Sequence, residues 1–479
     1  MVPGIARADE ASMQEKLDAM VDQLNHQNRK IGRLESRLAQ YEGGIPAERM
    51  LALEKELLQM RTELSQVSSS DLVPGWLSKD LDFHASVIVS YYGVYGDDRA
   101  YTGDAAGVAR RQMAADTIDT HQMVYSLKFG MNKSFGPDWD AGITFSSSLG
   151  NGNDAFIVMG GSGGGNGQPY FGEDELGIYR AFISWHPECI PGLTVTGGKF
   201  DNPFVTTAMV WDPEITPEGI YGTYEFQTDG PVKPFFTTAM LIADEEANDR
   251  DVHAFAYQVG FTWEKVADSF DWTSAFAFYD WDGYEDAPNL NLPGTVAAGD
   301  LWPLGARVTN LYGNSVSLRR SDGSVYYDAG DFSILNFTNT FDFELPVGES
   351  SLPVSVFTDI AFNADTANTQ YDALNGMDLG KRNEKCAYGA GFTLNGLDGK
   401  GSWEFGYRYA FIEPNAIVGA FGDLDFGFAN RKGHVIGGGY QVHDNVTLYA
   451  TVWVTEPIYD RDHTISTTPS FEFDVIFEY

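Results

Sequence analysis

Two different hydrophobic periods divide the chain. From Leu17 to Val67 apolar residues recur with a mean spacing of about 3.5 residues, and after Lys79 the spacing changes to two. A period of 3.5 is typical of helices in a coiled coil, whereas a period of two is typical of strands with one apolar face. The sequence therefore predicts an α-helical coiled coil followed by an all-β domain.

The apolar residues of the first segment form a narrow stripe on otherwise charged helices. Residues 43–46, which include two glycines and a proline, interrupt the helix. So narrow a stripe indicates a coiled-coil seam, in which Gln27 favours one register and one oligomeric state. We expect a trimer, although the seam residues do not exclude other oligomers. The seam positions are Leu17, Met20, Leu24, Gln27, Ile31, Leu34, Leu38 and Tyr41, then Met50, Leu53, Leu57, Met60, Leu64 and Val67.

The chain is expected to contain four consecutive parts. Residues 1–8 end in Ala6-Arg7-Ala8, which is typical of the end of a signal peptide, although an ordinary cytoplasmic start is the alternative. Residues 9–70 form the coiled coil, which we place in the periplasm, and residues 71–78 form a linker. Residues 79–479 form the β domain.

Sixteen segments of the β domain alternate between apolar and polar residues. In residues 403–411, for example, five aromatic residues alternate with Glu404, Gly406, Arg408 and Ala410. The connections after even-numbered segments are short, and most of those after odd-numbered segments are long. The segments are 79–95, 119–133, 138–150, 177–187, 192–200, 218–227, 231–245, 251–265, 269–282, 331–345, 353–365, 384–396, 401–413, 431–442, 445–456 and 470–479.

Long loops at one rim and tight turns at the other are typical of antiparallel transmembrane barrels of the outer membrane. A soluble β-sandwich or solenoid is the alternative. In a sandwich, however, the charged residues opposite the aromatic face would lie in the core, where an unpaired charge is costly. We therefore predict an all-β, sixteen-stranded, antiparallel transmembrane barrel.

Composition and charge agree with a membrane barrel and exclude other classes. Lys and Arg number 31 against 68 Asp and Glu, so the net charge is −37 and a general nucleic-acid binder is excluded. Aromatic residues make up 14% of the chain, and 52 residues are glycine. Cys189 and Cys386 are too few for a disulfide framework, and we expect them at opposite rims, too far apart to pair.

Catalytic and cofactor motifs receive little support. The 8 histidines lie outside the sequence contexts of serine hydrolases and metalloproteases. The glycine-rich residues 160–165 precede no Lys-Ser or Lys-Thr pair, so a flexible loop is expected there rather than a phosphate site. We expect no enzyme, no metal and no cofactor.

Two stretches carry a family resemblance. Residues 403–448, which include Phe421-Gly422-Asp423-Leu424-Asp425-Phe426-Gly427 and Lys432-Gly433-His434, resemble the closing region of the bacterial "Putative porin" family. Gly198-Lys199-Phe200-Asp201-Asn202-Pro203-Phe204 resembles a Gly-x-x-x-Asn-Pro-Phe stretch of the same family. The resemblance implies a Gram-negative outer-membrane channel that forms trimers, and it identifies no substrate.

The expected constriction lies at the connection 201–217, whose three prolines limit its freedom. We expect this loop to fold inward with Asp201, Asp212 and Glu214. Solvated loop acids are the alternative for each of these residues. The alternation places the cations Lys128, Arg180 and Arg408 on the lumen face, where they would face the loop across the pore, and Glu404 lies on the same face. Opposed charges at a constriction select ions.

These observations predict a passive diffusion channel for ions and small hydrophilic solutes, with a mild preference for cations. The expected partners are two further copies in a homotrimer, outer-membrane lipid and lipopolysaccharide, and peptidoglycan, with no nucleic acid. The alternative function is a barrel that anchors the coiled coil and links the outer membrane to the cell wall. An outer-membrane enzyme ranks below both.

Overall fold

The computed structural model describes residues 80–96, 118–148, 156–159, 175–244, 251–266, 270–284, 314, 318–319, 325–327, 332–348, 350–365, 371–372, 377–378, 384–458 and 468–479. The predicted coiled coil and linker lie outside these residues. Sixteen long strands make up the described part. They are β1 (Leu81–Gly96), β2 (Ile118–Ser134), β3 (Trp139–Ser148), β5 (Glu175–Trp185), β6 (Leu193–Lys199), β7 (Glu218–Glu225), β8 (Val232–Asp244), β9 (Val252–Val266), β10 (Phe270–Asp282), β13 (Phe332–Val347), β14 (Ser350–Asn363), β17 (Cys386–Gly396), β18 (Trp403–Ile412), β19 (Arg431–His443), β20 (Val446–Pro457) and β21 (Thr468–Glu478).

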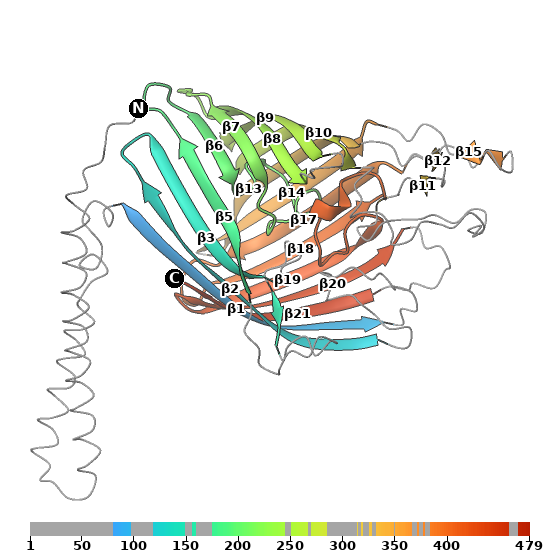
Figure 1. The fold of residues 1–479 in the computed structure, drawn as a ribbon. Helices are drawn as coiled ribbons and strands as arrows, with labels where there is room; N and C mark the ends of the chain where they lie inside the picture. Colours follow the sequence, from blue (N-terminus) through green and yellow to red (C-terminus); the bar gives the residue numbers. More distant parts are fainter. Residues whose placement is uncertain are drawn as a thin grey trace, which may run out of the picture. The chain divides into compact units, whose positions relative to one another are not determined.

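The sixteen strands form a closed antiparallel barrel. Each strand pairs with the next one along the chain, and β1 pairs with β21, from Ser86 opposite Glu478 to Val94 opposite Ser470. Figure 1 shows β1 in blue beside β21 in red. The predicted fold class and strand number are confirmed. Among the described residues, no helix is long and apolar enough to cross a membrane.

Three further pairings involve strands of two or three residues. β4 (Ile157–Val158) pairs with β2 at Val124 and Tyr125. β11 (Leu318–Arg319) pairs with β12 (Val325–Tyr327), and β15 (Tyr371–Asp372) pairs with β16 (Met377–Asp378).

The two rims differ as predicted. Short connections join the strands at one rim, called here the short-turn rim: residues 135–138, 186–192, 226–231, 267–269, 348–349, 397–402 and 444–445. Mostly longer connections lie at the other, the long-loop rim: residues 97–117, 149–174, 200–217, 245–251, 283–331, 364–385, 413–430 and 458–467. Cys189 lies in a turn of the short-turn rim, and Cys386 begins β17 at the long-loop rim.

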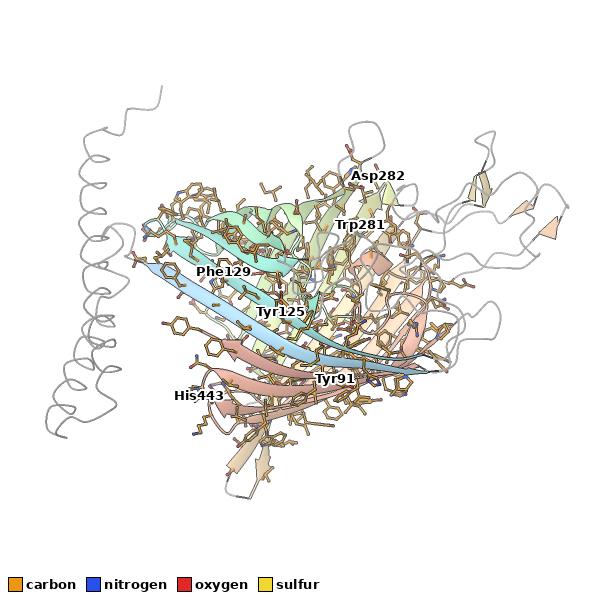
Figure 2. All side chains as sticks on the ribbon, turned by 60° about the horizontal axis from the view of Figure 1, so that its bottom comes forward. Tyr91, Tyr125, Phe129, Trp281, Asp282 and His443 are labelled. Carbon is orange, nitrogen blue, oxygen red and sulfur yellow. The ribbon has the colours of Figure 1, made fainter. Side chains whose placement is uncertain are left out.

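The outer face of the barrel is apolar and aromatic because successive side chains point to opposite faces of a strand. On β2, Met123, Phe129 and Met131 are exposed on this face, whereas Val124 and Ser126 are buried on the lumen side. Figure 2 shows Tyr125 and Phe129 on β2 and Tyr91 on the neighbouring β1. In a soluble protein so many exposed rings would favour aggregation, whereas a lipid bilayer accommodates them.

The lumen face is divided into a polar half and an apolar half. On β1–β6, its buried residues are mostly hydroxyl-bearing, among them Ser90, Ser126, Thr144, Ser184 and Thr196. From β8 to β18, the part near the long-loop rim is apolar. This apolar wall consists of Leu241, Ala254, Ala256, Ala277, Tyr279, Trp281, Phe332, Ile334, Ala361, Ala387, Ala410 and Ile412.

Two glycines mark where the wall of the barrel turns inward. Gly198 (φ +122°) and Gly219 (φ +140°) lie opposite each other at the ends of β6 and β7. A Cβ atom at Gly198 would lie 2.2 Å from the carbonyl oxygen of Ala181. Only glycine adopts this backbone conformation without strain.

Substitution of Gly198 should therefore destabilise the barrel. We expect Gly198→Ala to lower the free energy of unfolding by about 1–3 kcal/mol, because a side chain adds both backbone strain and a clash. The measurement is urea-induced unfolding of the protein refolded in lipid vesicles. Gly222→Ala is the control, because its Cβ would meet no atom closer than 3.8 Å. Equal unfolding midpoints for the two variants would contradict the prediction.

Candidate functional site

Two connections of the long-loop rim fold into the barrel. The first inner loop, residues 200–217, joins β6 to β7, and the second inner loop, residues 413–430, joins β18 to β19. Both bury apolar side chains against the apolar wall, including Trp211 and Ile215 from the first and Ile417 and Phe426 from the second. Burial of each such side chain contributes about 1.5–3 kcal/mol, so the two loops and the wall form one hydrophobic core inside the barrel.

Buried polar side chains of the wall hold the backbone of the first inner loop. Gln258 on β9 donates a hydrogen bond to the carbonyl oxygen of Val205 and accepts one from its N–H, both at 2.9 Å. Further along, the Thr207 hydroxyl donates to the carboxylate of Asp359 on β14 at 2.5 Å. Gln258 and Asp359 lie two strands or more from β6 and β7, so the loop extends across the barrel interior.

Asp359 is a fully buried carboxylate. Besides Thr207, it accepts hydrogen bonds from Asn336 at 2.5 Å and from Thr338 at 3.4 Å, both on β13. An unsatisfied buried charge would cost several kcal/mol. The interaction with Thr207 therefore satisfies the carboxylate and positions the loop at once.

Asn314 attaches the connection between β10 and β13 to the second inner loop. Its side-chain nitrogen donates to the carbonyl oxygens of Pro414 (2.6 Å) and Ile417 (2.8 Å). Its side-chain oxygen accepts from the N–H of Gly419 (2.8 Å) and the hydroxyl of Tyr284 (2.9 Å). A side-chain amide has two donor hydrogens and two acceptor lone pairs, and Asn314 uses all four.

The two inner loops also bind each other. The N–H of Asp212 donates to the carbonyl oxygen of Phe421 at 2.7 Å, and the Asp212 carboxylate accepts from the N–H of Leu424 at 3.1 Å. Burial raises the pKa of the Asp212 carboxyl, although its two backbone donors oppose this effect. Phe421 stacks on Trp211 and Trp281, with ring centroids 5.2 and 4.8 Å apart. Figure 2 marks Trp281 near the end of β10.

Two cations of the polar half contact acids of the first inner loop. Lys128 Nζ on β2 lies 3.7 Å from a Glu214 carboxylate oxygen and 4.3 Å from the centre of the Tyr179 ring. Arg180 on β5 forms an ion pair with Asp201. The prediction placed these cations across the pore from the loop, whereas the structure brings them into contact, because the loop itself crosses the lumen.

The third predicted cation, Arg408, belongs to the other half of the site. It forms an ion pair with Asp423 of the second inner loop, and the other oxygen of that carboxylate accepts from the N–H groups of Asp425 and Phe426. Arg408 therefore holds the second loop rather than facing the first across open space. Glu404, also on β18, accepts a hydrogen bond from the Tyr449 hydroxyl at 3.1 Å.

A cavity of about 400 Å³ lies along the polar half of the lumen. Its lining includes Lys128, Tyr179 and Arg180, together with His84 and Thr144, which are hydrogen-bonded to each other at 2.9 Å. The lining also includes Asn445 and Glu478 near the short-turn rim. The cavity thus extends from the charged contacts of the first inner loop toward the short-turn rim.

Sequence reasoning placed the charged residues of the first inner loop but missed the second loop as a partner and missed the residues that hold both loops. Gln258, Asn314 and Asp359 are single polar residues in segments that otherwise fit the strand or loop pattern. One signal was present: both inner loops are unusually apolar for surface connections, with Val205, Val210 and Trp211 in the first.

Comparison with known proteins followed the same lines. The model of a protein family described as "Putative porin" matches residues 96–477. No curated protein matches the chain. Among solved structures, OprB of Pseudomonas putida is 10% identical with a TM-score of 0.47, covering 88% of this chain and 96% of OprB. A variant of the Rh. blastica porin is 10% identical with a TM-score of 0.38, covering 83% of this chain and 100% of that porin. A loop-deletion variant of OmpT, an outer membrane protein of Vibrio cholerae, is 9% identical with a TM-score of 0.40, covering 83% and 99%.

Removal of the Asn314 side chain should loosen the interior. Asn314→Ala leaves buried donors and acceptors of the second inner loop without partners, so we expect the free energy of unfolding to fall by about 2–4 kcal/mol. Urea titration in lipid vesicles measures the change. Asn202→Ala removes one hydrogen bond, to the N–H of Phe204, and serves as the comparison. A loss for Asn314→Ala no larger than that of the comparison would contradict this role.

Proposed function

Because the chain belongs to the family described as "Putative porin", we propose that it is an outer-membrane porin, a passive diffusion channel for ions and small hydrophilic solutes. The observation that carries this proposal is the asymmetry of the lumen. The inner loops cover the apolar wall, and the cavity lies beside the polar half. Polar and charged side chains replace part of the hydration shell of a passing solute, as passive transport requires.

The constriction in this proposal lies where Lys128 and Arg180 meet Glu214 and Asp201. The cations are the less exposed members of these pairs: Lys128 and Arg180 side chains are 20% and 18% exposed, against 37% and 64% for Glu214 and Asp201. A solute therefore meets carboxylate oxygens more readily than ammonium or guanidinium groups. This difference favours a mild preference for cations.

The proposed assembly is a homotrimer in outer-membrane lipid, with lipopolysaccharide around the long-loop rim and the coiled coil of residues 9–70 in the periplasm. An acidic surface favours binding of divalent cations, which bridge carboxylates to lipid phosphates. The heptads at residues 17–67 support self-association through the coiled coil.

Single-channel recording tests the channel directly. We expect the purified, refolded protein to insert into a planar bilayer with stepwise conductance, in groups of three levels for a trimer. Folding is checked independently by the difference in gel migration between heated and unheated samples. Folded protein without conductance would refute the channel and would favour the anchor role, for which residues 1–70 would link the barrel to the cell wall.

Neutralising the two exposed acids should weaken the cation preference. In a salt gradient, we expect the double variant Asp201→Asn/Glu214→Gln to lower the ratio of cation to anion permeability by roughly twofold or more, because Lys128 and Arg180 then lose their counter-charges. The reversal potential measures this ratio. Asp229→Asn, in the turn between β7 and β8, is the charge-matched control. An unchanged reversal potential in the double variant would place selectivity elsewhere.

Release of the first inner loop should widen the pore. Thr207→Val together with Gln258→Leu removes the hydrogen bonds that hold the loop backbone to β9 and β14. We expect larger single-channel conductance and more current noise than in the parent protein. Thr262→Val, which removes a hydroxyl hydrogen-bonded to Thr273, is the control away from the loop. Identical conductance in both variants would show that the loop does not limit the pore.

A further inference from the structure

The barrel wall is low at β6 and β7. These strands contain 7 and 8 residues, whereas β2 contains 17. A tilted transmembrane strand needs about 9–11 residues to cross the hydrocarbon core. The chain leaves the wall at Lys199, enters the lumen as the first inner loop, and returns at Glu218. The wall between β5 and β8 is therefore incomplete above this level.

The gap leaves part of β5 as a sheet edge. Residues Ala181–Trp185 of β5 pair with β6, but β5 begins six residues earlier, at Glu175. Among the described residues, the only hydrogen bond reported on the gap side of this extension comes from the Thr216 hydroxyl to the carbonyl oxygen of Tyr179, at 2.7 Å. Exposed sheet edges do not occur in lipid, because lipid tails satisfy no backbone hydrogen bonds. Protein must therefore cover this edge.

The extension lies within the wall rather than above it. Leu176 pairs with Ser147 of β3, and the neighbouring Ser146 pairs with Lys128 of β2. From Lys128, β2 continues a further ten residues toward the long-loop rim, to Ile118. Strands on that side of the gap thus rise well beyond the level at which β6 ends.

The outer surface around the gap is suited to contact with protein. Leu176, Ile178, Ile183 and Ile220 are all more than half exposed. Between them the outer face carries the small residues Ala181, Gly197 and Gly222, which allow another backbone to approach closely. The alternation also places the ion pair of Lys199 and Glu218 (2.8 Å) on this outer face, where direct contact with lipid would be costly.

We propose that the outer face of β5–β7, called here the low-wall surface, is the interface with a second copy of this chain. The proposal depends on the proposed function only in placing the barrel in a membrane. A second copy is the favoured occupant because cyclic assembly covers the same gap in every copy. The low-wall surface also carries one charge of each sign at its centre, and the heptads at residues 17–67 independently predict self-association.

Bulky side chains at the small outward positions test the interface. A Cβ at Gly197 or Gly222 would meet no atom closer than 3.8 Å, so an isolated barrel should tolerate phenylalanine at either position. We expect Gly197→Phe and Gly222→Phe to reduce the assembly in detergent to the mass of one chain, 52.8 kDa. Ala390→Phe, at an exposed outward position on β17, should leave the assembly intact. Light scattering coupled to size exclusion measures the mass, and heat-dependent gel migration reports folding.

Photo-cross-linking provides a second test that does not depend on destabilising the assembly. We expect p-benzoyl-phenylalanine at position 220 to give a covalent product of twice the chain mass in purified protein, and the same group at position 390 to give none. A monomeric parent protein, or folded phenylalanine variants of unchanged mass without cross-linking at position 220, would overturn the proposal. If the phenylalanine variants fail to fold, the cross-link alone decides. Monomeric variants that still conduct would support this interface and leave the channel proposal intact.

Discussion

Backbone N–H and C=O groups need hydrogen-bond partners, and in the hydrocarbon region of a membrane only the protein can supply them. The closed ladder from β1 to β21 meets this constraint for most of the chain. It also dictates the consequences of folding a loop inward. When the chain leaves the wall after Lys199, β5 loses its neighbour along residues 175–180. The route of the first inner loop and the low-wall surface are therefore two results of the same departure.

The interior of the barrel combines a hydrophobic core with a few buried polar anchors. Apolar burial holds the two inner loops against the wall, but burial alone is non-directional. Gln258, Asp359 and Asn314 add direction, because each binds particular groups of an inner loop: the backbone around Val205, the Thr207 hydroxyl, and the backbone at Pro414, Ile417 and Gly419. A shift of either loop would leave these buried groups without partners, which is costly.

The same arrangement connects the core to the proposed selectivity. Because the first inner loop is held at fixed points, Asp201 and Glu214 meet Arg180 and Lys128 at the edge of the polar half. The stems of the two cations pack on aromatic rings, Lys128 over Tyr179 and Arg180 over Phe182, which keeps them partly covered. The carboxylates remain the more accessible charges. Charge at the constriction thus depends on packing as much as on composition.

The sequence by itself determined the strands, their number and the two kinds of rim, because a period of two, turn residues and loop lengths are local properties. It also placed Asp201 and Glu214 on an inward loop and Lys128 and Arg180 on the lumen face. Only the tertiary structure decided which charges pair, as Arg408 with Asp423 illustrates. It alone united the two inner loops with the wall, because contacts such as that of Thr207 with Asp359 join positions 152 residues apart, and no local pattern records such a distance.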